Sequence, residues 1–270
     1  MAERTARPSL RALAEAVSEA ADHGLTLWAG GRTQVKRWEK TAGELVSEAD
    51  LEVNQILHER LRALDPDAGW LSEETADSAH RLECERIWVV DPIDGTRDYL
   101  RGRPGWAVSV ALIDRGVPVL GVLAAPARNE LWLARFGHGA TRNGHVLKAG
   151  DRTALTGARV PADTLPKTDR DLTPVPRPNS IALRMAMVAA DQVDLCATIR
   201  WGNEWDIAAA ALIAHEAGAV VTDALGRPLR FNRPRATAFG ILCAAPGIHE
   251  KAVERLSERA HAALGQNPHI

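Results

Sequence analysis

Apolar residues recur at helical spacing in two stretches near the start of the chain. Between Pro8 and His23 they fall on one face, and Gly24 is expected to end that helix. A second helix is expected within residues 43–64, and the S-x-x-D spacing of Ser47 and Asp50 is typical of a capping box at its start. The apolar positions are Leu10, Leu13, Ala14, Val17, Ala20 and Ala21 in the first stretch, and Val53, Ile56, Leu57, Leu61 and Leu64 in the second.

Shorter apolar runs follow these helices. Ile87–Val90 is bounded by charged residues and is predicted to be a buried strand that ends at Asp91. After Gly105, apolar runs alternate with tight turn residues, as in successive antiparallel strands. Residues 1–150 are therefore expected to form an α+β subdomain.

The remaining residues have a different pattern. Residues 161–178 contain five prolines and few apolar side chains, which predicts a loop and a subdomain boundary. Beyond it, helices are expected at 181–190, 204–218 and 247–264, and strands at 219–223 and 239–245. This alternation predicts an α/β subdomain over residues 151–270.

Length and charge restrict the classes of function. With 270 residues, one compact unit with two subdomains is expected. Lys and Arg number 33 against 35 Asp and Glu, a net charge of −2, which favours a small-molecule partner over a nucleic acid polymer or a membrane surface.

The cysteines and the N-terminal segment indicate a compartment. Cys84, Cys196 and Cys243 are isolated in the sequence, which argues against a disulfide framework and a zinc site and favours the cytoplasm. The first twenty residues are charged and amphipathic, unlike a secretory signal. No apolar stretch approaches the roughly 18 residues of a membrane span.

The segment WVVDPIDGT, residues 88–96, is the strongest candidate for chemistry. Pro92 forces the chain out of the strand after Asp91, and a turn at Asp94 and Gly95 would bring the two carboxylates together. Such a pair repels unless a cation compensates, and hard oxygen donors favour Mg²⁺. A helix starting at Thr96 would offer backbone N–H groups to a phosphate. The alternative is that D-P-x-D-G is turn chemistry alone.

Two other acidic positions are candidates, each with a structural alternative. Glu73 and Glu74 follow a short apolar pair and could equally belong to a solvated loop. Asp206 stands in the first turn of an alanine-rich helix, where a carboxylate is favourable with or without a metal.

The segments LSEET, WVVDPIDGT and EWDIAAAALIAHEAGAVVTD, in this order and at these separations, resemble the inositol monophosphatase superfamily of Mg²⁺-dependent, lithium-sensitive phosphatases. The resemblance extends from the first helix to about Ala245 and is weakest between residues 151 and 175. It implies a layered α-β-α-β-α sandwich of the inositol monophosphatase or sugar phosphatase type, in agreement with the α+β and α/β halves.

The resemblance also implies roles for individual residues. Two to three Mg²⁺ ions are implied, and Thr96 with Asp50 is implied to orient and deprotonate the attacking water; for Asp50 this competes with the capping-box role. The implied metal ligands are Glu73, Asp91, the carbonyl of Ile93, Asp94 and Asp206, with Glu73 also holding a catalytic water. The expected substrate-binding residues are Asp94, Gly95, Thr96 and Asp206, to which Arg200 is added on the basis of its own charge, as argued below.

Two substrate classes are open. The LSEE and EWD segments are more similar to the 3'(2'),5'-bisphosphate nucleotidases, which hydrolyse adenosine 3',5'-bisphosphate to AMP and phosphate. Ile199 stands where inositol phosphatases tend to have an acid, and Arg200 could pair with a second phosphate. A nucleotidase is therefore the main prediction, and an inositol-1-phosphate phosphatase is the alternative.

The sequence departs from the inositol monophosphatase pattern at some positions, and two other classes of protein are alternatives. Residues 178–184, PNSIALR, replace a frequent glycine-serine pair, and Arg97 either grips a phosphate or is solvated. A haloacid-dehalogenase phosphatase is less favoured because its aspartates are two residues apart, whereas Asp91 and Asp94 are three apart. A non-catalytic metal-binding protein would leave Thr96 and Glu73 without a purpose. The expected partner is a small phosphorylated metabolite, and a homodimer is compatible with these expectations.

Overall fold

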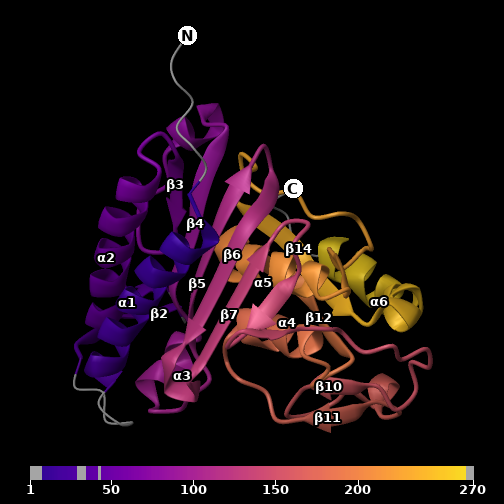
Figure 1. Cartoon of the computed structure of the whole chain (residues 1–270). Helices are drawn as coiled ribbons and strands as arrows, with labels where there is room; N and C mark the ends of the chain where they lie inside the picture. Colours follow the sequence, from indigo (N-terminus) through magenta and orange to yellow (C-terminus); the bar gives the residue numbers. More distant parts are fainter. Residues whose placement is uncertain (1–7, 29–34, 42–43, 266–270) are drawn as a thin grey trace.

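The computed structural model describes residues 8–28, 35–41 and 44–265, which are arranged in five layers (Figure 1). A helical pair covers one face of a seven-stranded sheet, and a second helical pair covers the other face. A three-stranded sheet and a final helix follow. The predicted α-β-α-β-α sandwich is confirmed. Residues 1–7, to which part of the secretory-signal prediction applies, lie outside the described residues.

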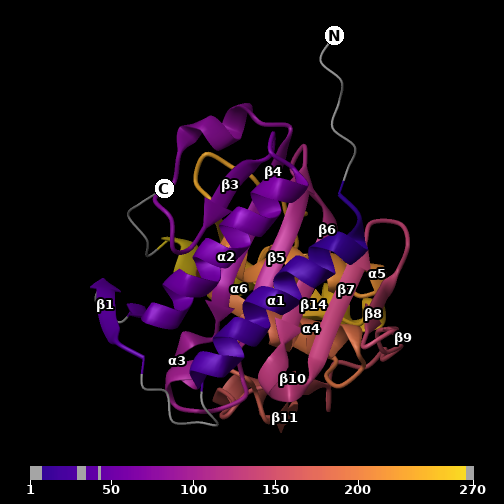
Figure 2. The ribbon, with the colours of Figure 1, turned by 60° about the vertical axis from the view of Figure 1, so that its left-hand side comes forward.

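The first layer consists of α1 (Leu10–Trp28) and α2 (Glu48–Leu64), which lie side by side in Figures 1 and 2. The prediction that Gly24 ends the first helix is wrong. A Cβ at Gly24 would lie 3.3 Å from Val53 and 3.7 Å from Trp106, so this glycine allows close packing inside a continuing helix. A short hairpin, β1 (Arg37–Thr41) and β2 (Glu44–Ser47), leads into α2.

The seven-stranded sheet carries the centre of the core. Its first pair, β3 and β4, is parallel and the other pairs are antiparallel. Successive side chains of β4 are buried on opposite faces, Trp88 and Val90 toward α1 and α2, and Ile87 and Val89 toward the second helical pair. The strands, in spatial order, are β3 (Gly69–Ser72), β4 (Arg86–Asp94), β5 (Ala107–Asp114), β6 (Val117–Ala125), β7 (Glu130–Arg135), β8 (Ala140–Arg142) and β9 (His145–Val146).

The second helical pair lies between the two sheets. It consists of α4 (Ile181–Ala189) and α5 (Glu204–Glu216), and α5 contacts strands of both sheets. Because α5 is rich in alanine it approaches the large sheet closely; a Cβ at Gly121 would lie 3.0 Å from the Ala209 carbonyl oxygen. The short helix α3 (Thr96–Leu100) follows β4 directly.

The second half of the chain forms the small sheet, in the order β12 (Leu195–Asn203), β14 (Thr237–Ala244) and β13 (Val220–Thr222). The final helix, α6 (Pro246–Gly265), packs on its outer face. The predicted loop 161–178 is partly regular, because β11 (Thr173–Val175) pairs in parallel with β10 (Arg159–Pro161). One apolar cluster includes residues from both sides of residue 150, and the division there into subdomains stays a prediction. Within the described part of the chain, no helix is long and apolar enough to cross a membrane.

Candidate active site

The end of β4 carries the central acids. Asp91 and Asp94 both pair with β5, and the register shifts between them, so the expected strand end at Asp91 is instead a bulge. The Asp91 carboxylate accepts a hydrogen bond of 3.1 Å from the backbone N–H of Ile93. This local bond, together with the missing N–H of Pro92, shapes a tight turn that presents both carboxylates.

Gly95 allows the chain to leave this turn. Its φ of 97° is left-handed, and it is the residue before α3. A Cβ there would lie 2.7 Å from the Gly105 carbonyl oxygen and 2.9 Å from the Ser180 backbone nitrogen. Only glycine fits this combination of backbone angle and close approach.

Four acids line one cavity of about 380 Å³, here called the acid-lined cavity, which lies within the range of small-molecule sites. Glu73 follows β3, Asp91 and Asp94 belong to β4, and Asp206 is the third residue of α5. The Asp206 carboxylate accepts a bond of 3.1 Å from the backbone N–H of Asn203 and so closes a capping box. Residues far apart in the sequence are thus brought together around one space.

These acids perturb one another. Burial, and then the charges of Glu73, Asp94 and Asp206, raise the pKa of Asp91 well above its usual range. Burial, and then Asp206 and Glu74, raise the pKa of Glu73 to about 8. Like charges held this close favour protonation or a bound cation.

Asp94 is held by hydrogen bonds from the start of α4. Its carboxylate accepts hydrogen bonds of 2.5 Å from the Ser180 hydroxyl and 2.7 Å from the Ala182 backbone N–H, at the start of α4. Among the described residues, no group of three or more His, Cys, Asp and Glu side chains is close enough to hold a metal ion as it stands. The four acids therefore line the same cavity, and the carboxylate of Asp94 is held by hydrogen bonds from the start of α4.

Asp50 has two contacts with different consequences. One carboxylate oxygen accepts bonds of 2.8 Å and 2.6 Å from the backbone N–H and hydroxyl of Ser47, which closes the predicted capping box of α2. The other lies 3.4 Å from the Thr96 hydroxyl, which also lies 3.1 Å from the Ile93 carbonyl oxygen. Burial raises the pKa of Asp50 to about 6. The cap and the Thr96 contact are therefore compatible, although they were expected to compete.

Comparison with known proteins identifies the architecture around this cavity. The model of the inositol monophosphatase family matches residues 4–263. The chain belongs to the inositol monophosphatase family. It is 33% identical over 236 residues to the fructose-1,6-bisphosphatase/inositol-1-monophosphatase of Thermotoga maritima, covering 83% of this chain and 88% of the relative. It is 35% identical over 210 residues to an inositol-1-monophosphatase of Rhizobium meliloti, covering 69% and 75%.

Solved structures agree with this family assignment. A Thermotoga maritima inositol monophosphatase superposes with a TM-score of 0.80 at 28% identity, covering 94% of this chain and 98% of the other. The extragenic suppressor protein SuhB of Bartonella henselae superposes with a TM-score of 0.79 at 26% identity, covering 92% and 98%.

Membership of the inositol monophosphatase family decides several predictions. Its members are phosphoric monoester hydrolases, so the predicted enzyme class is confirmed, and the haloacid-dehalogenase alternative is set aside. The family is metal-dependent, generally with Mg²⁺.

The nucleotidase branch is not supported by the relatives described above, whose names favour the inositol phosphatase alternative. The residue roles stay predictions.

The donor set of this family member fits Mg²⁺. The side chains that line the cavity near Asp91 offer carboxylate oxygens, which are hard ligands suited to Mg²⁺. Burial is the largest cause of the raised pKa values of Asp91 and Glu73, and the charges of neighbouring acids add to it. A bound divalent cation would offset that repulsion.

Two contributors were missed from the sequence. Lys40, on β1, forms an ion pair with Glu74 and donates a bond of 3.2 Å to the Glu73 carbonyl oxygen, so the hairpin reaches the acidic cluster. Ser180 binds Asp94 across 86 positions of the chain. A serine before an apolar helical run is a helix-start signal, but the sequence does not indicate which distant carboxylate it meets.

Arginines form a second part of the acid-lined cavity. Arg97, Arg177, Arg184 and Arg200 all line it. Arg200, predicted to bind substrate, is exposed on β12, whereas Ile199 packs in a small apolar cluster with Phe239. The acid-lined cavity is therefore lined by arginine side chains as well as by carboxylates.

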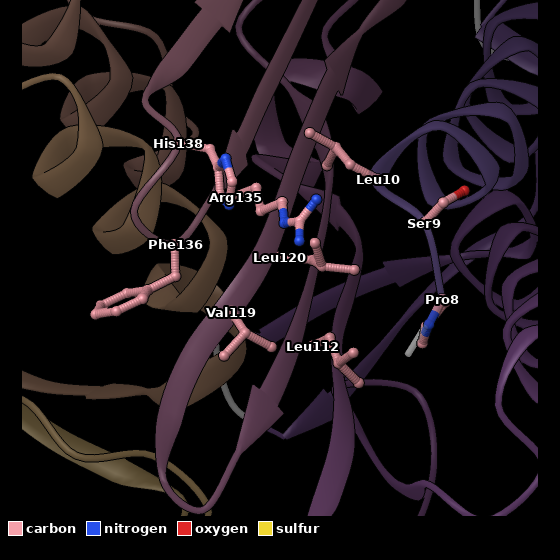
Figure 3. Close-up of a pocket in the computed structure, with 9 residues that line it drawn as sticks. All are labelled: Pro8, Ser9, Leu10, Leu112, Val119, Leu120, Arg135, Phe136 and His138. Atoms are coloured by element: carbon pink, nitrogen blue, oxygen red, sulfur yellow. The ribbon is translucent and has the colours of Figure 1, made fainter. Parts of the chain in front are cut away.

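A separate cavity of about 380 Å³ lies at the start of α1 (Figure 3). Leu112, Leu120 and Arg135 line it from three neighbouring strands, opposite Ser9 and Leu10. It contains no acid and shares no lining residue with the acid-lined cavity. We therefore assign the chemistry to the acid-lined cavity.

Proposed function

We propose that this chain is a Mg²⁺-dependent phosphatase of polyol or sugar phosphate monoesters, with inositol 1-phosphate as its reference substrate. The observation that carries the proposal is the joint placement of Glu73, Asp91, Asp94 and Asp206 around one cavity, with Thr96 beside Asp50 at its edge. A phosphate monoester fits both the family and this concentration of cation-binding groups.

The proposed ligands of two to three Mg²⁺ ions are Glu73, Asp91, the carbonyl of Ile93, Asp94 and Asp206. Bound divalent ions neutralise charge on phosphoryl oxygens, activate water and stabilise the leaving alkoxide. The protein holds Asp94 in place through Ser180 and holds Asp206 through the capping box of α5.

Thr96 and Asp50 are the proposed route for the proton of the attacking water. A threonine hydroxyl is a poor base alone and needs an acceptor behind it. The single hydroxyl proton of Thr96 has two acceptors within reach, the Ile93 carbonyl and Asp50, and the proposed role requires that it go to Asp50. A pKa of about 6 leaves Asp50 able to accept a proton near neutral pH. Backbone N–H groups of Gly95 and Thr96 are proposed to hold the phosphate.

A 3'(2'),5'-bisphosphate nucleotidase is the second candidate. It is favoured by one observation, the presence of Arg200 in the wall of the acid-lined cavity, where it could meet a second phosphate. The names of the relatives favour the inositol phosphatase reading. A small phosphorylated metabolite as partner, a cytoplasmic location and a homodimer remain predictions with either substrate.

The test is phosphate release from inositol 1-phosphate and from adenosine 3',5'-bisphosphate, side by side, with Mg²⁺ and with chelator. We expect release to require Mg²⁺ and kcat/KM to be higher for inositol 1-phosphate. A higher value for the nucleotide would select the second candidate. Full activity in chelator, or no release from any phosphomonoester despite Mg²⁺ binding, would contradict the proposal.

A further inference from the structure

Two buried charges outside the acid-lined cavity have no part in the proposed mechanism. Arg81, on the short 3₁₀ helix η2 (Ala79–Glu83), is 2% exposed, and Glu204, the first residue of α5, is 1% exposed. Neither is among the described residues that line the acid-lined cavity. A buried charge is unfavourable unless it is paired and hydrogen-bonded, so the partners of these two side chains show which segments they hold together.

Glu204 attaches the start of α5 to residues 232–236, which precede β14. Its carboxylate accepts hydrogen bonds of 2.7 Å from the backbone N–H of Asn232 and 3.1 Å from that of Arg233. Its own backbone N–H donates to the Ala236 carbonyl at 2.9 Å. Asp206, a proposed metal ligand, is the third residue of the same helix.

Arg81 reaches residues 232–236 from the first half of the chain. Its Nη1 donates a hydrogen bond of 2.7 Å to the side-chain oxygen of Asn232, whose Nδ2 donates back to the Arg81 carbonyl at 3.1 Å. Nε and Nη2 of Arg81 donate to the Asp77 carboxylate at 2.6 Å and 2.9 Å, which compensates the buried charge. Two residues 151 positions apart are thus joined by two reciprocal hydrogen bonds.

Asn232 is the residue that joins the two buried charges. Its backbone N–H donates to Glu204, and its side chain bonds Arg81. Its φ of 59° is left-handed, a region that asparagine tolerates better than most residues other than glycine. The contacts among Arg81, Asn232 and Glu204 are here called the buried bridge.

The buried bridge connects the chain segments that carry Glu73 and Asp206. Glu73 follows β3, and Arg81 lies in the same connection between β3 and β4. Burial, and then the charge of Asp206, raise the pKa of Glu73 to about 8, so these two acids are close enough to repel each other. A fixed link between their segments opposes that repulsion when no cation is bound.

We propose that the buried bridge positions Glu73 and Asp206 for Mg²⁺, with Asn232 as the positioning residue on which it depends. The inference rests on the proposed function, which supplies the identity of the ligands. The three residues act through the placement of these two acids and do not themselves line the acid-lined cavity. Residues that orient metal ligands typically change metal affinity or activity by about 10- to 100-fold.

Asn232→Gly is the variant that tests the buried bridge. It removes both side-chain bonds to Arg81 and keeps the backbone conformation, because glycine adopts positive φ freely. Calorimetry with Mg²⁺ alone should show about tenfold weaker binding than in the wild-type chain. The Mg²⁺ concentration for half-maximal phosphate release from inositol 1-phosphate should rise in parallel. At saturating Mg²⁺, kcat should stay near the wild-type value, because bound ions draw the two carboxylates back together.

Asn143→Gly is the matched control. Asn143 also has a left-handed φ, of 50°, and makes two side-chain bonds, from the Leu131 N–H at 2.7 Å and to the Asn129 carbonyl at 2.8 Å. It does not line the acid-lined cavity. Both variants should lose stability to urea, and only Asn232→Gly should bind Mg²⁺ more weakly.

Arg81→Lys provides a second test from the other side of the contact. It keeps the buried charge but loses the fork that reaches Asp77 and Asn232 together, so Mg²⁺ binding should weaken. The double variant should bind Mg²⁺ about as weakly as the weaker-binding single variant, because both substitutions break the same contact. Additive losses would mean that the two residues do not act through one bridge.

The outcomes separate the buried bridge from the proposed function. If Asn232→Gly binds Mg²⁺ as tightly as Asn143→Gly, the positioning role is wrong, whatever the rate of phosphate release. If the wild-type chain binds Mg²⁺ but releases phosphate from no monoester, the proposed function is wrong, and calorimetry still decides on the bridge. If the wild-type chain binds no Mg²⁺, both proposals are overturned.

Discussion

The Ser180 hydroxyl donates a hydrogen bond of 2.5 Å to the carboxylate of Asp94, joining the start of α4 to the end of β4. Ser180 also caps α4, because its hydroxyl oxygen accepts a bond of 2.9 Å from the Leu183 backbone N–H. The position of a proposed metal ligand therefore depends on a helix from the second half of the chain.

Ser180→Ala should weaken both the helix and the site. Loss of an N-cap costs about 1 kcal/mol of unfolding free energy, measured by urea denaturation. Because Asp94 also loses a donor, the Mg²⁺ concentration for half-maximal activity should rise. Ser9→Ala, which removes the cap of α1 far from the acids, is the matched control for stability alone. The same Mg²⁺ requirement in both variants would contradict the positioning role of Ser180.

Asp206→Asn should lower turnover by roughly 10²-fold or more, because it removes a charge from the proposed ion site. Steady-state rates at saturating Mg²⁺ measure the effect. Glu258→Gln, at an exposed position of α6, should retain the wild-type rate. Normal kinetics with a small loss of stability would limit Asp206 to its role at the start of α5.

Thr96→Ala removes the proposed proton route and leaves the acids in place. Turnover should fall by roughly 10²- to 10⁴-fold, the usual contribution of general base catalysis, while the Mg²⁺ affinity measured by calorimetry changes little. Asp50→Asn should lower both the rate and the unfolding free energy, because one carboxylate contacts Thr96 and caps α2. A wild-type rate with lowered stability in Asp50→Asn would reject the proton-accepting role of Asp50 and leave only its role in capping α2.

Gly95→Ala should be far more damaging than an ordinary glycine substitution. The new Cβ would lie within 2.7 Å of a backbone oxygen, and the positive φ adds strain. Gly137→Ala is a matched control, since φ is +73° there and no atom lies within 4 Å. The thermal midpoint should drop clearly more in Gly95→Ala, and equal drops would disprove the close approach.

Without Mg²⁺, stability should fall as the pH rises from about 5 to 8. Burial raises the pKa of Asp50 to about 6, and burial with neighbouring acids raises the pKa of Glu73 to about 8. The folded state therefore holds protons that the unfolded state releases near pH 4, and this stabilisation is lost as the pH rises through the two folded pKa values.

Excess Mg²⁺ should reverse this trend, because it binds the ionised carboxylates of the folded state. Urea denaturation at pH 5, 6, 7 and 8, with chelator and with Mg²⁺, tests both statements. Glu204→Gln separates a second contribution, since burial raises the pKa of Glu204 to about 7. A flat curve in chelator would mean that the acids are not coupled as described.

Local patterns were sufficient for the elements that carry the chemistry. The turn after β4 was predicted because Pro92, Asp94 and Gly95 restrict the backbone through neighbouring residues alone. The start of α2 was predicted for the same reason, since Ser47 and Asp50 are three residues apart. These features do not depend on the rest of the fold.

The sequence-based predictions failed where contacts between residues far apart in the chain determine the structure. Gly24 lies inside α1 because Val53 and Trp106 pack against it, and neither contact is visible in the local pattern. β12 was missed because its sequence, LCATIRWGN, mixes apolar and polar residues without strict alternation, and only its first two residues, Leu195 and Cys196, are buried. The contacts of Lys40 and Ser180 likewise depend on long-range packing.

The capping boxes at α2 and α5 have a consequence for the evolution of this site. Asp50 and Asp206 each complete the capping box of a helix. Asp206 also lines the acid-lined cavity, and Asp50 contacts Thr96, which lines it. A descendant that lost catalysis would still be selected to keep both for folding, whereas Glu73 caps no described helix and would be free to drift. Among relatives of this chain, the residue at position 73 should therefore distinguish active phosphatases from inactive ones better than either capping aspartate.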